Sequence, residues 1–192
     1  MTYAQEGATP RRPAETYGAI AQGFHWVTFA LVAAQFALGW LMPHVHRGTR
    51  PVGLISLHLS IGLLILAVIL LRFAWRLAQG APAVPEARPL WQRHLGDAVH
   101  FLLYLVVLVM VVTGWINAAG RGWTLSFFGL FSLPSFTVPR PSMIHTIANY
   151  HITLSWWFLG IIGFHVAAVL VHQLWYRDRT LQRMLPRGGP RR

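Results

Sequence analysis

Charged residues are absent from four long stretches of this chain, which cover residues 16–46, 51–71, 98–120 and 141–176. A helix needs about 20 mostly apolar residues to cross the ~30 Å hydrocarbon core of a membrane. Each stretch contains an apolar run of this kind, and the second is strongly aliphatic (ISLHLSIGLLILAVILL). The pattern therefore predicts an all-α fold, an integral membrane four-helix bundle with spans at about 18–43, 52–76, 98–118 and 147–175.

A fifth uncharged stretch, GWTLSFFGLFSLPSFTVP, follows Arg121 and ends before Arg140. Pro134 and Pro139 interrupt it, and a proline removes a backbone donor, which is costly in lipid. The aromatic side chains of this stretch suit the boundary between membrane and water. We therefore expect residues 121–141 to form an outer interfacial segment and not a fifth span.

The distribution of arginine predicts the orientation. With four spans, twelve of the sixteen arginines lie on the side that holds both chain ends, and the chain has no lysine. The other side holds only four, namely Arg47, Arg50, Arg121 and Arg140. The positive-inside rule then predicts a cytoplasmic tail at 1–17, a transmembrane domain at 18–176 and a basic cytoplasmic tail at 177–192.

Composition narrows the classes of function. Of the 192 residues, 55% are hydrophobic and 11% charged, the formal net charge is +11, and there is no cysteine. The chain is too apolar to be disordered or to be a typical DNA-binding domain, so its charge indicates topology and contact with membrane lipid, with no nucleic acid as partner. The absence of cysteine excludes disulfides, thiolate catalysis, thiolate metal sites and haem attached through cysteine.

Histidines inside the predicted spans are the most informative residues, because polar groups at membrane depth are costly and normally face the bundle interior. His25 lies near the cytoplasmic start of the first span, and His58 lies just inside the outer start of the second. His151 and His165 are 14 residues apart on the fourth span, so they project from nearly one face with about 21 Å between them along the axis. Depth pairs His58 with His151 and His25 with His165.

Two opposed imidazoles are what a low-spin b-type haem requires, and bundle cores commonly house such cofactors. The prediction is therefore two haem b groups, the inner iron held by His25 and His165 and the outer iron by His58 and His151. Filled axial positions favour electron transfer over oxygen binding. Alternatively, the histidines are core residues bonded to neighbouring carbonyls, or they relay protons. Zinc also binds histidine but lacks its usual carboxylate or thiolate companions here.

Several short motifs accompany these histidines. They are FHW in the first span, LHLSIG and RFAWR in the second, HFLLYL and TGW in the third, GLFSLP in the outer loop and VHQLWYRDRTLQRMLPR after His165. In this order they resemble the bacterial cytochrome b561 family of four-helix, two-haem membrane proteins, over roughly residues 18–187. The resemblance implies the same four axial histidines. It also implies the bacterial inner membrane and quinone-linked electron transfer, and one branch of the family oxidises superoxide at the outer face and reduces ubiquinone.

Three more residues are site candidates near the cytoplasmic side. His100, at the start of the third span, matches a histidine of the family pattern, and His172 lies two turns beyond His165. Either is a candidate for binding quinone or relaying protons. Arg72, at similar depth, is a candidate for binding a cofactor. For His100 and Arg72 the alternative is a residue that only anchors a helix end at the headgroups.

The predicted function is that of a di-haem cytochrome b, an oxidoreductase or electron carrier. It would transfer electrons between an outer-face donor, such as superoxide or a redox protein, and the membrane quinone pool. A first alternative is a haem-bearing membrane subunit that relays electrons for a separate dehydrogenase or hydrogenase. A second is a haem-free transporter or structural bundle.

Overall fold

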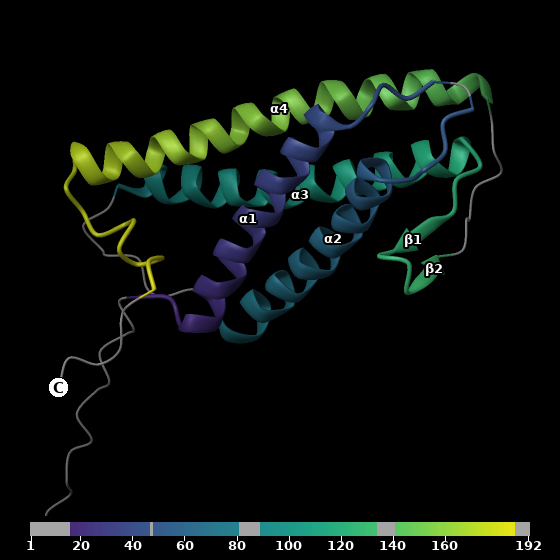
Figure 1. Cartoon of the computed structure of the whole chain (residues 1–192). Helices are drawn as coiled ribbons and strands as arrows, with labels where there is room; N and C mark the ends of the chain where they lie inside the picture. Colours follow the sequence, from purple (N-terminus) through teal and green to yellow (C-terminus); the bar gives the residue numbers. More distant parts are fainter. Residues whose placement is uncertain (1–15, 47, 81–88, 134–140, 187–192) are drawn as a thin grey trace, which may run out of the picture.

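The computed structural model describes residues 16–46, 48–80, 89–133 and 141–186 and consists mainly of four long helices (Figure 1). They are α1 (Ala19–Leu41), α2 (Leu54–Gln79), α3 (Leu90–Gly120) and α4 (Pro141–Leu174). A short antiparallel hairpin, β1 (Leu125–Phe127) and β2 (Phe131–Leu133), lies between α3 and α4 in the sequence. The predicted all-α, four-helix class is therefore confirmed.

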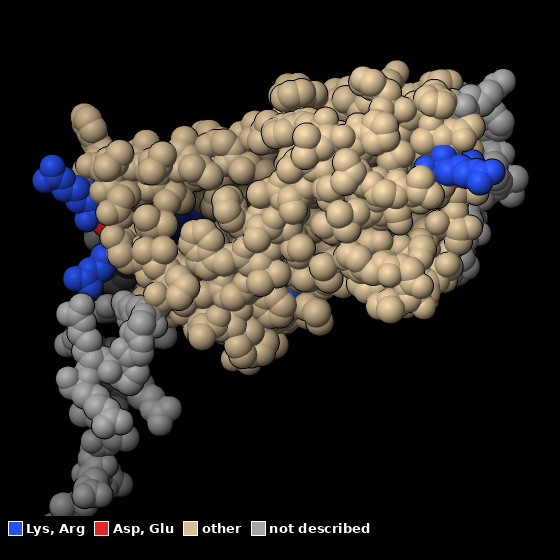
Figure 2. Space-filling model, in the orientation of Figure 1, with Lys and Arg blue, Asp and Glu red and all other residues tan. Residues whose placement is uncertain are grey.

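The surface of the bundle is apolar. All four helices are long and apolar enough to cross a membrane. Large aromatic side chains point outward, and those of Trp40, Phe101, Trp156 and Trp157 are between 61% and 69% exposed. Figure 2 shows arginines mainly at the two ends of the long axis, with only small blue areas on the body between them. Lipid chains can solvate such a surface, whereas in water it would promote association. The chain is a multi-pass membrane protein.

The helices form two pairs, with α1 packed against α2 and α3 against α4, and α2 also packs against α3 (Figure 1). Both ends of the described chain lie together, because the amide of Tyr17 donates a hydrogen bond to the carbonyl oxygen of Arg183 (3.3 Å). We call this the terminal end. The opposite end, which carries β1 and β2, we call the hairpin end.

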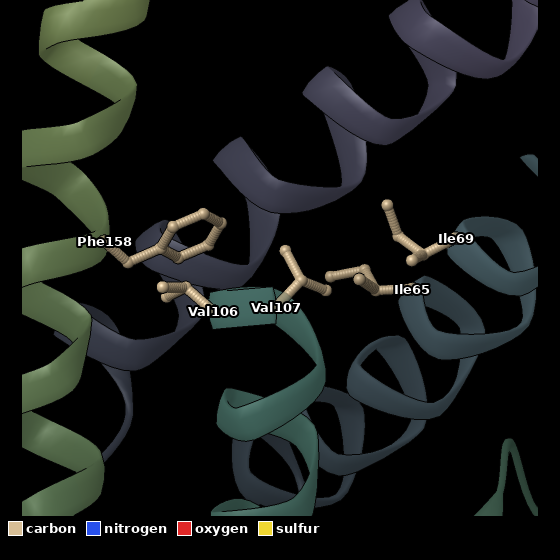
Figure 3. Packing of buried hydrophobic residues seen from close by; sticks show 5 residues of the cluster. All are labelled: Ile65, Ile69, Val106, Val107 and Phe158. Carbon is tan, nitrogen blue, oxygen red and sulfur yellow. The ribbon is translucent and has the colours of Figure 1, made fainter. Parts of the chain in front are cut away.

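A small apolar core lies at mid-height between the helix pairs. It is made by buried side chains of α2, α3 and α4 (Figure 3), namely Ile65, Ile69, Val106, Val107 and Phe158. Leu31 and Phe36 of α1 pack against it, so all four helices meet there. Phe158 is midway in sequence between His151 and His165, and the core therefore separates two levels of histidine.

The hairpin is attached to α2 through one buried hydroxyl. Ser60, which is 1% exposed, donates from Oγ to the carbonyl oxygen of Ser126 (2.9 Å) or of Ser56 (2.9 Å). The amide of Phe128 donates in turn to Ser60 Oγ (3.1 Å). Phe128 has a φ of 50° and Gly129 a φ of 75°, so both turn residues adopt the left-handed conformation. These bonds hold the hairpin over the end of the bundle.

After α4 the chain returns to the start of α1. Gln22 Nε2 donates to the carbonyl oxygen of Arg183 (3.2 Å), and Trp26 Nε1 donates to that of Met184 (2.8 Å). The described part of the basic tail, residues 177–186, therefore covers the terminal end of α1. The 121–141 segment forms β1 and β2 in its first half, and residues 134–140 of it lie outside the described part.

Candidate functional site

Four histidines face one another in two pairs. The ring centroids of His25 on α1 and His165 on α4 are 6.4 Å apart, and those of His58 on α2 and His151 on α4 are also 6.4 Å apart. All four residues are half-buried. Because α4 supplies one histidine to each pair, each pair bridges the two halves of the bundle. The inner pair lies towards the terminal end and the outer pair towards the hairpin end.

The separation of the rings matches a metal ion held between two imidazoles. With metal–nitrogen bonds of about 2 Å and the ligating nitrogen ~1.1 Å from each centroid, the centroids would lie roughly 6.2 Å apart. Direct stacking or a hydrogen bond between two imidazoles would bring them closer. Within the described residues, no group of three or more His, Asp or Glu side chains is arranged to hold a metal ion. Two ligands at each level fit the axial ligation of a haem iron.

The outer pair is supported by α3 and by a close approach of backbone. Thr113 Oγ1 lies 3.0 Å from His151 Nδ1. A Cβ atom at Gly114 would lie 3.2 Å from His151 Cε1, and one at Gly39 would lie 3.7 Å from His58 Cε1. A side chain at position 114 would therefore require the imidazole of His151 to shift by a few tenths of an ångström.

Gln35 contacts the other outer histidine. Its Nε2 donates to the main-chain oxygen of His58 (2.9 Å), while Gln35 Oε1 and His58 Nδ1 are buried and have no hydrogen-bond partner within the described part of the chain. Buried polar atoms of this kind are rare. Iron on Nε2 would fix a proton on Nδ1, and a neighbouring amide oxygen is a suitable acceptor for it. These atoms therefore fit a haem ligand at His58.

The inner pair lines a cavity of about 360 Å³ together with Arg72, His100 and mostly apolar side chains. Arg72 Nη2 lies 3.3 Å from His25 Nδ1, and the guanidinium lies over the Tyr104 ring, 5.7 Å from its centroid. No carboxylate lies within ion-pair distance of Arg72 in the described part of the chain. A cation at membrane depth normally faces an anion. A cofactor that carries carboxylates would supply one, so Arg72 fits a haem as well.

The other two candidates lie in different places. The ring of His100 lies beside His165, with 5.3 Å between centroids, and its Nδ1 is 2.7 Å from the carbonyl oxygen of Gly96. His172 does not line the cavity. Its Nδ1 pairs with Asp178 Oδ2 (2.7 Å) beyond the end of α4. The structure therefore brings His100, but not His172, next to the inner pair.

The sequence matches a known family over nearly its whole length. The family described as prokaryotic cytochrome b561 matches residues 16–187. The chain belongs to this family. Membership implies a b-type haem, and it makes this cytochrome b561 a membrane cytochrome b that carries electrons.

Three curated relatives are similar to this cytochrome b561 over most of their length. Cytochrome b561 homolog 2 of Escherichia coli K12 is 29% identical over 177 residues, which cover 91% of this chain and 94% of the relative. Cytochrome b561 homolog 1 of the same organism is 28% identical over 166 residues, 85% and 93% respectively. The probable superoxide oxidase CybB of Yersinia pestis is 28% identical over 174 residues, 89% and 96% respectively.

The supporting residues around the outer pair were not anticipated from the sequence. Gly39 and Gln35 carry no signal that separates them from ordinary helix-packing residues. Thr113 and Gly114 do belong to the TGW motif, which contributed to the family resemblance. Apart from that resemblance, no sequence pattern separates these two residues from the other small and hydroxyl residues of a membrane span.

Proposed function

We propose that this cytochrome b561 binds two b haems, one between His25 and His165 and one between His58 and His151. We further propose that it passes electrons from a donor at the outer face, with superoxide as the candidate, to ubiquinone. The observation that carries the proposal is the ring separation of 6.4 Å at both levels. Two coincidentally facing histidine pairs in a bundle core would have no reason to share the spacing of iron-bound imidazoles.

The proposed orientation places the terminal end in the cytoplasm of a bacterial cell and the hairpin end outside the inner membrane. Twelve of the sixteen arginines belong to segments on the terminal side: nine are in the two tails and the loop between α2 and α3, and three are in the parts of α2 and α3 that adjoin this loop. The positive-inside rule supports this orientation. The outer pair of histidines is then the one nearer to an external donor.

Each part of the chain has a separate task in this proposal. Bound haem iron supplies a one-electron couple with no open coordination position. The four histidines hold it, Thr113 and Gly114 orient and admit His151, and Arg72 supplies a positive charge to the carboxylates. The apolar core around Phe158 keeps water out of the region between the two levels.

Superoxide is the candidate donor for two reasons. A relative of similar length is named a probable superoxide oxidase. In addition, no acidic residue lies in either outer loop, while four arginines do. One of them, Arg121, donates from Nε to Asn117 Oδ1 (3.2 Å), and its guanidinium lies 5.5 Å from the Trp123 ring centroid. Such a positive field increases the encounter rate of an anion.

The reaction balances as two superoxide ions oxidised to two molecules of O₂, while one ubiquinone takes two electrons and two protons to become ubiquinol. We assign quinone binding or proton relay at the cytoplasmic side to His100 and His172. His100 lies at the cavity of the inner pair. His172 has a carboxylate partner at the terminal end, in Asp178.

The proposal is tested by mixing purified, haem-loaded protein with superoxide and a soluble ubiquinone analogue. We expect ubiquinol to form with the protein alone, in proportion to superoxide consumed, and we expect His151→Ala to abolish it. Reduction of quinone only after addition of a membrane-bound dehydrogenase or hydrogenase would instead indicate a relay subunit. Absence of haem absorption bands from the purified protein would contradict the proposal, because every step of it requires haem. It would favour a transporter or a structural bundle.

A further inference from the structure

The two histidine pairs differ in what lies behind their rings. At the outer level the neighbour of His151 is a hydroxyl, in Thr113, and at the inner level the neighbour of His25 is a cation, in Arg72. Both contacts are made to Nδ1, which leaves Nε2 of each ring free to face its partner across the bundle. Groups that contact the ligating rings in this way change the reduction potential of a bound metal. The inference drawn from this difference rests on the proposed function, because it requires a haem at each level.

The geometry of Thr113 makes it an acceptor. A hydroxyl has one proton, and Thr113 Oγ1 donates it along its own helix, to the carbonyl oxygen of Val109 (2.8 Å) or Met110 (3.1 Å). The hydroxyl oxygen, 3.0 Å from His151 Nδ1, is then available to accept an N–H from the imidazole. An imidazole that donates from Nδ1 is a more basic ligand at Nε2, and a more basic ligand favours oxidised iron.

Arg72 cannot act in this way. A guanidinium has five donors and no acceptor, so it cannot accept an N–H from His25. What it brings to the inner level is a positive charge, in a part of the protein where the dielectric constant is lower than in water. Adding an electron to iron is more favourable beside a cation. The carboxylates of the two haems are the same and do not distinguish the two levels. The positive charge of Arg72 at the inner level does.

The other polar groups at the outer level are acceptors like Thr113, namely the Met110 carbonyl oxygen at His151 and the Gln35 amide oxygen near His58, and the charged groups nearby do not reverse the difference. Arg76 is paired with Asp97 (4.0 Å), so the two charges partly cancel. The His100 Nδ1 contact is with the oxygen of Gly96, on its own helix. Arg121 follows Gly114 by seven residues, about 10 Å along the helix axis, and it lies at the surface, where salt and water screen it.

We propose that the two haem sites have unequal reduction potentials, the outer one lower and the inner one higher, and that Thr113 and Arg72 are the positioning residues that set the difference. Electrons that enter at the hairpin end then pass downhill to the terminal end. The direction of transfer is thereby built into two side chains that do not ligate iron themselves.

The test is a redox titration of the purified, haem-loaded protein, followed by its absorption spectrum. His151→Ala and His165→Ala identify the components, because each removes one haem. We expect Thr113→Val to raise the reduction potential of the outer component by up to about 59 mV. For a one-electron couple this is a tenfold change in the equilibrium between oxidised and reduced iron. Thr113→Ser, which keeps the hydroxyl, should restore it. Arg72→Gln should lower the inner component by a similar factor.

Matched controls come from neighbouring residues of the same type. Ser155→Ala removes a hydroxyl that donates to Ile152 on α4, one turn from His151, and Arg76→Gln removes an arginine one turn from Arg72. Ser155→Ala should move neither potential, and Arg76→Gln, which removes a charge on a side chain 35% exposed to solvent, should lower the inner potential by less than Arg72→Gln does. The inference is overturned if Thr113→Val and Arg72→Gln leave both potentials unchanged, if they move both components equally, or if the outer component is the higher one. Protein that binds no haem would instead overturn the proposed function.

Discussion

Replacing Gly114 by alanine would place a methyl group against the ring of His151. The new carbon would lie 3.2 Å from Cε1, 3.7 Å from Nδ1 and 4.0 Å from Nε2 of that ring. Ordinary contacts between carbon atoms are about 3.5–4.0 Å, so the imidazole must move by a few tenths of an ångström or tilt. Such a movement would also disturb the contact between Thr113 Oγ1 and His151 Nδ1 (3.0 Å).

The expected cost follows from the overlap. Overpacking of a tight site typically costs about 1–3 kcal/mol, and each 1.4 kcal/mol changes a binding constant about tenfold. Gly114→Ala should therefore weaken binding of the outer haem by roughly 5- to 150-fold and leave the inner haem unaffected. Gly39→Ala is the matched control, because its methyl group would lie 3.7 Å from His58 Cε1, an ordinary contact. Both glycines are in helices, so the gain in helix propensity is shared.

The assay is the loss of haem from each purified variant to an excess of a haem-scavenging protein, followed by absorption. Haem loss from the two sites should give two kinetic phases. Each phase is assigned to a site with His151→Ala and His165→Ala, which keep only one haem each. Gly114→Ala should accelerate one phase only, that of the outer haem, and Gly39→Ala should resemble the wild type. Equal loss in both glycine variants would refute the contact argument, and so would unchanged haem retention in Gly114→Ala.

Three further predictions concern single contacts. Ser60→Ala should destabilise the hairpin by about 1–3 kcal/mol, because it leaves the Phe128 amide without its acceptor. Limited proteolysis between β1 and β2 should become faster than in Ser155→Ala. Equal rates would show that Ser60 does not hold the hairpin. Trp26→Phe removes the N–H that donates to Met184 and should weaken the attachment of residues 177–186 by about 0.5–1.5 kcal/mol. Proteolysis within these residues should then become faster. Unchanged cleavage would show that other contacts hold the segment. His100→Gln should slow quinone reduction while the haem spectrum stays intact, and an unchanged rate would remove His100 from the mechanism.

The helices could be predicted from the sequence because lipid imposes a simple rule. Every backbone group in the hydrocarbon core must be bonded within its own helix, so a charge-free apolar stretch has few alternatives. Hydropathy marks only the part of each helix that lies in lipid, however. Helix α3 begins at Leu90 and α4 at Pro141, where polar residues continue the helix beyond the membrane, and proline is well tolerated in a first helical turn.

The hairpin and the folded-back tail were not predictable in the same way. Strands of three residues are too short to show an alternating pattern, and the bonds that hold them come from Ser60, which is distant in the sequence. The segment after α4 is held through main-chain oxygens of Arg183 and Met184. Main-chain acceptors are the same for every residue type, so the basic side chains there indicated only a solvated tail.

For the site, the sequence predicted which histidines would share a level, because helical periodicity and depth restrict a residue inside a span. The structure brings those rings together, and their role as iron ligands stays a prediction. Thr113 and Gly114 could not be identified in this way. Small and hydroxyl residues are common wherever two membrane helices pack, and only the position of His151 against α3 distinguishes these two from the rest.

The most direct test of the account is the number of haems per chain, measured from the reduced-minus-oxidised spectrum and the protein concentration. We predict two b haems in the wild type and one in each of His151→Ala and His165→Ala, with different spectra in the two variants. A wild type without haem, or a His151→Ala protein that keeps both haems unaltered, would contradict it.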